Sequence, residues 1–124
     1  MSDECIFCNN PGTEIVAENQ LAKAFYDKYP VNPGHTLIIP KRHVETLFEA
    51  SYAELEAINQ LLFIVKVKLD QIFHPDGYNV GVNVGEAAGQ TIFHLHYHVI
   101  PRYFGDVPNP RGGVRKVKRN TSHY

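Results

Sequence analysis

The most regular alternation of apolar and polar residues lies in the middle of the chain and predicts one long helix. Ser51 and Glu54 stand three positions apart, the spacing of a capping box at a helix start. Apolar residues then recur at steps of three and four over about five turns. They are Leu55, Ile58, Leu62, Val65, Leu69 and Ile72, broadened by Leu61, Ile64 and Lys68. The run His74-Pro75-Asp76-Gly77 ends the pattern. A stripe this wide covers a sheet or forms a helix-mediated dimer contact, and the sequence leaves both hypotheses open.

Shorter runs with strand character surround this helix. Residues 36–39 are β-branched and apolar and stop at Pro40, which predicts a buried strand. Further strands are expected at residues 14–17, 22–26, 78–84 and 91–103. Because strands outnumber helices and the one long helix lies mid-chain, the predicted class is α+β with a largely antiparallel sheet. No repeat or linker divides the chain, so we expect one domain over residues 1–124, with a core at 1–104 and a basic tail containing Gly and Pro at 105–124.

Three histidines occupy alternate positions of the last predicted strand, namely His94, His96 and His98. Residues two apart in a strand point to the same face, so the three histidines should share one face, opposite Leu95, Tyr97 and Val99. A row of imidazoles is compatible with one metal bound by all three, with covalent catalysis by one of them, or with a structural role. Three on one face make the structural role the weakest of these hypotheses.

The loop before the histidines consists mostly of small residues. Gly85, Ala87, Ala88 and Gly89 allow a ligand to approach the backbone closely, and their N–H groups are candidates to hold an anion. Gln90 adds side-chain donors, and Asn83 and His35 supply more. The residues predict a phosphate-binding surface built from hydrogen bonds, without the spacing of a nucleotide P-loop.

Composition narrows the class of protein. The 124 residues are 44% apolar and 20% charged with a net charge of −1, which argues against non-specific nucleic-acid binding. A local exception is the basic cluster near the end, made of Arg111, Arg115, Lys116, Lys118 and Arg119. No membrane-length apolar run and no leader pattern occur, so we expect a cytoplasmic protein. In a reducing compartment Cys5 and Cys8 indicate a metal site or a redox pair.

Several blocks, taken in order, resemble the histidine-triad (HIT) superfamily over most of the chain, from near Cys5 to at least Arg102. The blocks are Gly89-Gln90-Thr91-Ile92-Phe93-His94-Leu95-His96-Tyr97-His98-Val99-Ile100, Pro33-Gly34-His35-Thr36-Leu37-Ile38-Ile39-Pro40-Lys41-Arg42-His43, Cys5-Ile6-Phe7-Cys8 and Gly81-Val82-Asn83. The resemblance implies a HIT-like fold with a zinc-stabilised N-terminus, a homodimer, and cleavage or transfer at the α-phosphate of a nucleotide.

The resemblance also implies individual roles. His96 would be the nucleophile that forms a nucleotidyl-histidine, and a neutral imidazole attacks phosphorus without first losing a proton. His98 would contact the phosphate or the bridging oxygen, and His35 would orient the triad. Gln90 and the loop residues Gly89 and Thr91 would hold the phosphoryl oxygens.

The same resemblance places the rest of the nucleotide and the metal. Asp27 would take the ribose hydroxyls, with a turn residue as the alternative, and Asn83 would reach the ribose or the phosphate. The residues expected to wall the base, or alternatively to be plain core, are Phe7, Phe25, Tyr26 and Leu37. The zinc ligands implied are Cys5, Cys8, His43 and His94, a closed set for a structural ion.

The tail resembles that of dinucleoside tetraphosphate hydrolases, so Arg111 and Arg115 would clamp the far phosphates. The favoured substrate is a dinucleoside polyphosphate. A nucleoside phosphoramidate, a phosphorylase reaction and a nucleotide-binding module with little turnover remain as alternatives.

Overall fold

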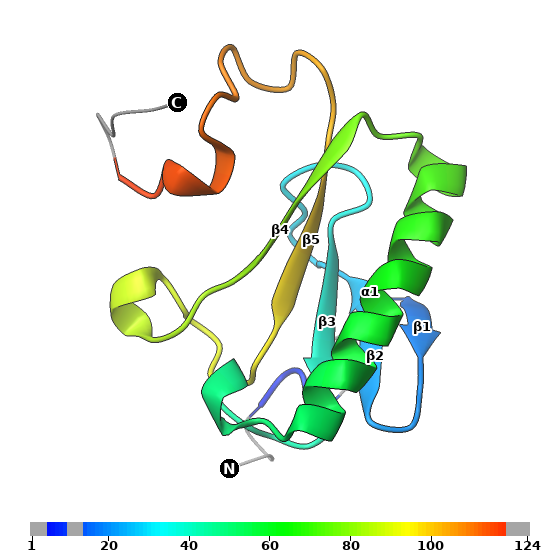
Figure 1. The fold of residues 1–124 in the computed structure, drawn as a ribbon, viewed down its shortest axis with the longest axis vertical. Helices are drawn as coiled ribbons and strands as arrows, with labels where there is room; N and C mark the ends of the chain where they lie inside the picture. The colour runs from blue at the N-terminus through cyan, green and yellow to red at the C-terminus, as the bar shows by residue number, and fades with distance from the viewer. Residues whose placement is uncertain (1–4, 10–13, 119–124) are drawn as a thin grey trace.

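The protein is described by a computed structural model that covers residues 5–9 and 14–118 of the chain. Within these residues, one five-stranded antiparallel sheet has the strand order β1-β2-β3-β5-β4. The strands are β1 (Ile15–Glu18), β2 (Ala22–Tyr26), β3 (Thr36–Pro40), β4 (Gly77–Val82) and β5 (Tyr97–Arg102). Helix α1 (Tyr52–Phe73) lies across one face of the sheet (Figure 1). The architecture confirms the predicted α+β class.

Helix α1 begins where the capping box predicts. The Ser51 hydroxyl accepts from the Glu54 N–H at 3.1 Å, and the Glu54 carboxylate accepts from the Ser51 N–H at 2.8 Å. The buried face is centred on Ile58, Leu61, Val65 and Leu69, with Glu54 and Ala57. The prediction that Ile64 and Ile72 belong to this face is wrong, because their side chains are 47% and 58% exposed. The helix ends at Phe73, and the left-handed backbone of the C-cap His74 (φ 53°) breaks the pattern before Pro75.

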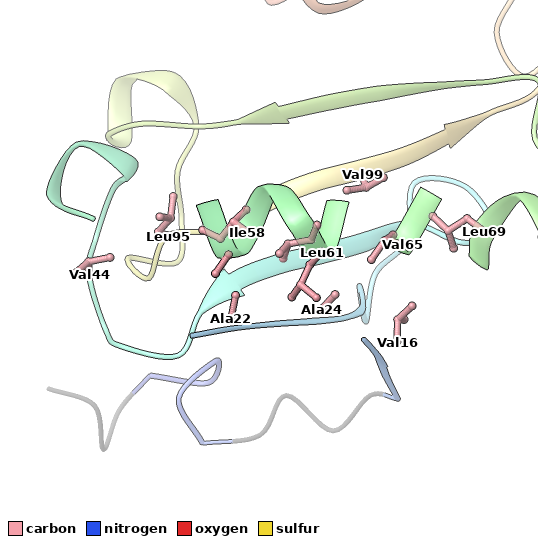
Figure 2. Packing of buried hydrophobic residues seen from close by; sticks show 12 residues of the cluster. Val16, Ala22, Ala24, Val44, Ile58, Leu61, Val65, Leu69, Leu95 and Val99 are labelled. Atoms are coloured by element: carbon pink, nitrogen blue, oxygen red, sulfur yellow. The ribbon is translucent and has the colours of Figure 1, made fainter. Parts of the chain in front are cut away.

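The sheet is covered on both faces, and side-chain alternation on β2 and β3 divides the two cores. Ala22, Ala24 and Ile38 pack with α1 in the larger core, where Leu61 and Val65 of the helix lie over the sheet (Figure 2). On the opposite face, a smaller core contains Cys5, Phe7, Phe25, Leu37 and Ile39. All five residues of β3 are buried, because both faces of that strand are covered. The buried strand was predicted over residues 36–39, and the structure extends it to Pro40.

The strand predicted at residues 91–103 is wrong at its beginning, since β5 starts only at Tyr97. The β3–β5 ladder stops at the Ile38–Tyr97 pair, two residues before Pro40. Proline has no N–H to offer a ladder, and the Pro40 carbonyl instead accepts from the His94 ring at 2.8 Å. The Leu95 N–H donates to the Val44 carbonyl at 2.7 Å. His94 and Leu95 are therefore held by hydrogen bonds that are not part of the β3–β5 ladder.

The part of the tail that the structure describes folds back onto the sheet. Its short 3₁₀ turn η4 (Gly113–Arg115) contacts β4, and Gly113 lies next to the Asn79 side chain. Residues 119–124 of the predicted basic tail, which include Arg119, lie outside the described residues. No helix in the described ranges is long and apolar enough to cross a membrane.

Candidate active site and metal cluster

The three histidines lie on the sheet face opposite α1, as the alternation predicts. Leu95 and Val99 are buried in the larger core beneath the helix. The rings of His94 and His96 instead contact Phe7 of the smaller core, with centroids 6.1 and 5.1 Å away. The His96 and His98 rings are 5.1 Å apart. The alternation thus persists although only His98 is part of a strand.

His94 belongs to a cluster with both cysteines. Its Nε2–H donates to the Pro40 carbonyl, so the neutral ring presents an unprotonated Nδ1 on its other side. That nitrogen is 3.4 Å from the Cys5 Sγ and 3.3 Å from the Cys8 Sγ. His43 Nδ1 lies 3.3 Å from the Cys8 Sγ. Four potential ligand atoms, all within 4.8 Å of one another, therefore meet between the N-terminal segment and the histidine run.

The geometry of this cluster fits a tetrahedral metal. Zinc bonds of about 2.3 Å to sulfur and about 2.0 Å to nitrogen place neighbouring S and N ligands about 3.5 Å apart. The contacts of 3.3–3.4 Å approach that spacing. A ligating histidine normally donates its other ring N–H to a carbonyl or carboxylate, as His94 does to Pro40. Cys5 and Cys8 are not bonded to each other. The cluster is thus suited to hold a metal ion with ligands from three chain segments.

The hypothesis of one metal bound by all three triad histidines does not agree with these contacts. His94 already uses one nitrogen toward Pro40 and the other toward the cysteines. His96 and His98 use their Nδ1 atoms toward two further partners. The triad is therefore divided between two sites.

His96 has the tautomer that a nucleophile needs. Its Nδ1 is 2.8 Å from the His94 carbonyl, which can only accept, so Nδ1 carries the proton and Nε2 carries the lone pair. Burial lowers the pKa of His96, while the bond to the His94 carbonyl and the charge of Asp27 oppose the shift. The side chain is only 8% exposed. His96 is therefore a neutral imidazole near pH 7.

His98 is oriented by His35 through a directed chain of hydrogen bonds. The Val31 N–H donates to His35 Nδ1 at 3.0 Å, so the neutral His35 ring carries its proton on Nε2. His35 Nε2 is 3.0 Å from His98 Nδ1, which must accept. The proton of His98 is then on Nε2. A backbone amide thus determines the tautomer of two side chains.

Both histidine rings in this chain of hydrogen bonds, His35 and His98, have a lowered pKa. Burial lowers the pKa of His98 to about 4, and the neighbouring His96 and His35 add to the shift. Burial also lowers the pKa of His35, against the attraction of Asp27. The directed chain therefore persists at neutral pH.

Asp27, His35 and His98 also bring three potential ligand atoms within 4.8 Å of one another. His35 nevertheless does not fit a metal at Nε2. A neutral ring that binds a metal at one nitrogen carries its proton on the other, and His35 Nδ1 accepts from the Val31 N–H. The Asp27 Oδ2 atom lies 3.5 Å from His35 Nε2, so this carboxylate faces the ring from the side. We therefore infer that this cluster fixes which ring nitrogen of His35 and of His98 carries the proton.

Asp27 is a turn residue, the alternative that the sequence left open, and its carboxylate also faces His35. Its Oδ1 accepts from the Tyr29 N–H at 2.9 Å, an Asx turn after β2. The side chain remains 17% exposed, with Oδ2 directed to His35. The turn and a ligand contact are therefore compatible in one carboxylate.

The residues expected to wall a base are divided by the sheet. Phe7, Phe25 and Leu37 lie in the smaller core on the histidine face and are at most 4% exposed. Tyr26 was expected with them, and the structure corrects this. It packs on the helix face, with its ring 6.0 Å from the ring of Phe73. The reason is the period of two along β2, which sends neighbours Phe25 and Tyr26 to opposite faces.

The small-residue loop is closed on itself, which corrects the expected role of Gln90. The Gln90 side chain is 2% exposed and fully engaged. Its Oε1 accepts from the Gly85 N–H, and its Nε2 donates to the carbonyls of Glu45 and Ile92. The N–H groups of residues 88–90 also bond within the loop. Because these donors are occupied, Gln90 shapes the loop and does not offer its amide to a phosphate.

The remaining predicted site residues lie at the surface. Asn83, Gly89 and Thr91 are exposed beside the histidine run. In the tail, Arg111 is exposed and Arg115 is half-buried in η4. The structure therefore leaves the roles of these residues as predictions.

Sequence reasoning missed the polar residues that support His35. Asn32, Arg102 and Asp106 form a hydrogen-bonded group behind it. Asn32 and Asp106 are 74 positions apart, so no local pattern could have paired them. The sequence signal available was the short polar side chain of Asn32 inside the proline-rich segment before His35.

Comparison with known proteins identifies the family. A family model described as the HIT domain matches residues 9–105. A 16.1 kDa HIT-like protein of Mycoplasma pneumoniae is 42% identical over 106 residues, which are 82% of this chain and 74% of that protein. A Mycobacterium tuberculosis protein named AP-4-A phosphorylase is 41% identical over 96 residues, 74% of this chain and 48% of that protein. This chain thus spans about half of the phosphorylase.

A solved structure agrees with the fold. The crystal structure of a zinc-bound histidine triad family protein from Mycobacterium smegmatis superposes with a TM-score of 0.78 at 31% identity. The match covers 88% of this chain and 82% of that chain.

Proposed function

The chain belongs to the HIT domain family, and from this premise we propose that it cleaves nucleotides at the α-phosphate through a nucleotidyl-His96 intermediate. The observation that carries the proposal is the tautomer of His96. Its Nδ1–H is held by the His94 carbonyl at 2.8 Å, so Nε2 is available as an uncharged nucleophile.

The first step forms a P–N bond. The lone pair on His96 Nε2 attacks the α-phosphorus, and the bond from phosphorus to the leaving phosphate oxygen breaks with its electron pair. The adduct is a cationic ring, and the His94 carbonyl stabilises the remaining Nδ1–H. The His98 Nε2–H donates a hydrogen bond to the phosphoryl or departing oxygen, where negative charge develops. The leaving phosphate departs as an anion without taking a proton from His98.

The second step releases the nucleotide. A water oxygen attacks phosphorus, the P–N bond breaks, and its electron pair returns to His96 Nε2. The water loses a proton to solvent, and the product is a nucleoside monophosphate. If inorganic phosphate attacks in place of water, the product is a nucleoside diphosphate. The AP-4-A phosphorylase relative favours this phosphorylase reaction as the second candidate.

The favoured substrate is a dinucleoside polyphosphate, with a nucleoside phosphoramidate as the alternative. Asp27 would accept from the ribose hydroxyls through Oδ2, because Oδ1 is already used by the Asx turn. Phe7, Phe25 and Leu37 would form the floor beneath the base, since they lie on the histidine face. Arg111 and Arg115 would contact the distal phosphates.

The metal of this proposal is a structural zinc ion. Cys5, Cys8, His43 and His94 would hold it, and a closed set of four ligands leaves no position for a reacting water. The zinc-bound relative supports the choice of metal. The ion would tie the N-terminal segment, and with it Phe7, to the segment that leads through His96 into β5.

We further propose a homodimer formed along β4 and α1. Strand β4 is an edge strand, and Val80 on it is 41% exposed beside the exposed helix residue Phe63. An apolar hollow of about 320 Å³ lies between these elements, lined by Leu62, Phe63, Lys66, Tyr78, Val80 and Val99. A second copy would cover this surface. The molar mass of the wild type and of Phe63→Glu, measured by light scattering, tests this, and a monomeric wild type would refute it.

The proposed activity is tested by His96→Ala with His74→Asn as the matched control. His74 is exposed in a left-handed conformation that Asn tolerates, so this variant changes a histidine outside the site. We expect His96→Ala to lose turnover and still bind a nucleoside monophosphate, while His74→Asn keeps both. Unchanged turnover in His96→Ala would refute the mechanism. Binding without turnover in the wild type would favour a binding module.

A substrate panel then distinguishes the reactions. Dinucleoside polyphosphates and nucleoside phosphoramidates are incubated with and without inorganic phosphate, and products are identified by mass. A nucleoside monophosphate in both conditions indicates a hydrolase, and a nucleoside diphosphate that depends on phosphate indicates a phosphorylase. Rapid quenching should reveal a nucleotidyl adduct on the peptide that contains His96.

A further inference from the structure

The carboxylate of Asp106 is the centre of a hydrogen-bonded group behind the site. The Arg102 guanidinium donates to both of its oxygens at 2.8 Å, and the Tyr103 N–H donates at 3.1 Å. The Arg102 pair holds the pKa of Asp106 well below its usual range, so this group remains an acceptor. An ionised carboxylate held by several hydrogen bonds therefore lies in the turn after β5.

Asn32 connects this carboxylate to the turn that precedes His35. Its Nδ2 donates to Asp106 Oδ2 at 2.8 Å and to the Pro101 carbonyl at 3.0 Å. Both amide protons are thus anchored to the segment around the end of β5. The backbone carbonyl of Asn32 accepts from the backbone N–H of His35 at 3.1 Å, which closes the turn. The side chain of Asn32 therefore fixes the backbone that carries His35.

This turn has little freedom to rearrange around its anchors. Gly34 adopts φ +91°, and an added Cβ there would lie 2.9 Å from the Phe73 ring and 3.1 Å from Pro101. The Tyr103 hydroxyl donates to the Pro33 carbonyl at 2.7 Å. The segment after β5 thus holds the turn at two successive residues, Asn32 and Pro33.

The anchored turn carries the amide that sets the histidine tautomers. Val31 precedes Asn32 directly, and its N–H donates to His35 Nδ1 at 3.0 Å. If that N–H moved away, His35 Nδ1 would be free to take the ring proton. His35 Nε2 would then accept, and His98 Nδ1, 3.0 Å away, would have to donate. The reversal would remove the proton from His98 Nε2.

We propose that Asn32 and Asp106 are positioning residues that keep the Val31 N–H on His35 and thereby hold His98 with its proton on Nε2. The effect on catalysis rests on the proposed function, in which the His98 Nε2–H donates to the phosphate. The effect on the tautomer does not, because it exists without substrate. An experiment can therefore refute the effect on catalysis without refuting the effect on the tautomers.

The test uses Asn32→Ala, which removes the two anchoring donors and retains the backbone groups. Asn59→Ala, at an exposed position of α1, is the matched control. The ¹⁵N shifts of the imidazole rings, measured without substrate on histidine-labelled protein, report the tautomers of His35 and His98. We expect a single Nε2–H form of His98 in the wild type and in Asn59→Ala. In Asn32→Ala the Nδ1–H form should become measurable.

The kinetic arm separates positioning from binding. For the substrate that the wild type turns over, Asn32→Ala should lower kcat about tenfold with KM changed less than about twofold, because the affected hydrogen bond strengthens as charge develops. Asp106→Asn, which keeps the shape of the carboxylate, is the second variant if Asn32→Ala does not fold. It should shift the tautomers in the same direction.

The outcomes decide between the two proposals. An Nδ1–H form of His98 in the wild type would overturn the positioning role, as would unchanged tautomers in the folded variants. Tautomers that shift while no nucleotide substrate is turned over by the wild type would support the positioning role and refute the proposed function.

Discussion

Two clusters on the same face of the sheet use similar residues for different purposes. The first joins Cys5, Cys8, His43 and His94, and the second joins Asp27, His35 and His98. In each, the potential ligand atoms lie within 4.8 Å of one another. Proximity alone would therefore assign a metal to both.

The difference lies in the hydrogen bond on the far side of one imidazole. His94 Nε2 donates to the Pro40 carbonyl, which leaves Nδ1 as a lone pair for a metal. His35 Nδ1 accepts from the Val31 N–H, which leaves Nε2 with a proton and unsuited to a metal. When one ring nitrogen donates to a backbone carbonyl, the other nitrogen is left with a lone pair that can bind a metal. When one ring nitrogen accepts from a backbone N–H, the other nitrogen carries the ring proton and acts as a hydrogen-bond donor. The polarity of one backbone group thus distinguishes a cluster suited to hold a metal from a chain of hydrogen bonds that fixes ring protons.

The largest expected effect is the loss of the metal on substitution of a cysteine in the first cluster. Cys5→Ala removes a buried ligand, so metal content measured by mass spectrometry should fall to background, and the melting temperature should drop. Asp27→Asn, in the second cluster, should leave the metal content unchanged. Full metal retention in Cys5→Ala would refute the ligand set, and metal loss in Asp27→Asn would show that the two clusters are not distinct.

The second cluster should instead reveal itself through pH. The folded His98 has a pKa of about 4 against an ordinary value of 6.5, first because of burial. Between pH 6.5 and 4 the unfolded chain binds a proton that folded His98 resists, so the free energy of unfolding falls as the pH is lowered through this window. Above pH 6.5 this contribution is constant.

His98→Asn isolates the contribution of His98 from the other histidines and from any bound metal. The difference in unfolding free energy between wild type and variant should change by roughly 2 kcal/mol across the window, after allowance for partial exposure. Denaturant titrations at a series of pH values measure it. A difference independent of pH would contradict the burial that places His98 in a directed chain.

How far the sequence could predict these clusters depends on the range of the interactions. The side-chain period of two correctly placed His94, His96 and His98 on one face, and the helix period correctly placed most of α1. Both are local patterns of an element with one buried face. The same rule applied to β2 would have excluded Tyr26 from the site, since Phe25 already faces the histidines.

The tautomers of His94 and His35 could not be predicted, because both depend on contacts with distant segments. For His94 the contact is direct, and for His35 it acts through Asn32, which anchors the nearby Val31 N–H. The Pro40 carbonyl lies 54 positions from His94, and Asp106 lies 74 positions from Asn32. Periodicity reports which face a side chain takes and is silent about the partner that it meets there. Gln90 shows the same limit, since its donors were expected on a phosphate and are used by Glu45 and Ile92.

A smaller effect should follow from loosening the segment that carries His43. Arg42 precedes it and donates to both carboxylate oxygens of Glu54 at 2.8 and 2.9 Å. This guanidinium is the main reason that the pKa of Glu54 falls to about 2. Glu54→Gln should lower the free energy of unfolding by roughly 1–2 kcal/mol, because Glu54 is buried while Arg42 is largely exposed.

The same variant also sharpens the comparison of the two clusters. Metal affinity, measured by competition with a chelator, should weaken in Glu54→Gln, while the His35 and His98 tautomers stay unchanged. Glu56→Gln, at an exposed position of the same helix, is the control. An equal loss of affinity in both variants would show that the Arg42–Glu54 pair does not support His43.

The smallest effect concerns the tail, which packs against β4, the strand that pairs with β5 at His98. Turn η4 packs next to Asn79, and two residues further along β4, Gly81 pairs with His98. A surface guanidinium that contacts a distal phosphate contributes roughly 0.7 kcal/mol, about threefold in affinity. Arg111→Ala should therefore raise KM about threefold for a dinucleoside polyphosphate and leave KM for a phosphoramidate unchanged. Lys68→Ala, on the part of α1 that faces β1, should change neither value. Equal changes for both substrates in Arg111→Ala would mean that the tail supports the fold of the site and does not read the length of the phosphate chain.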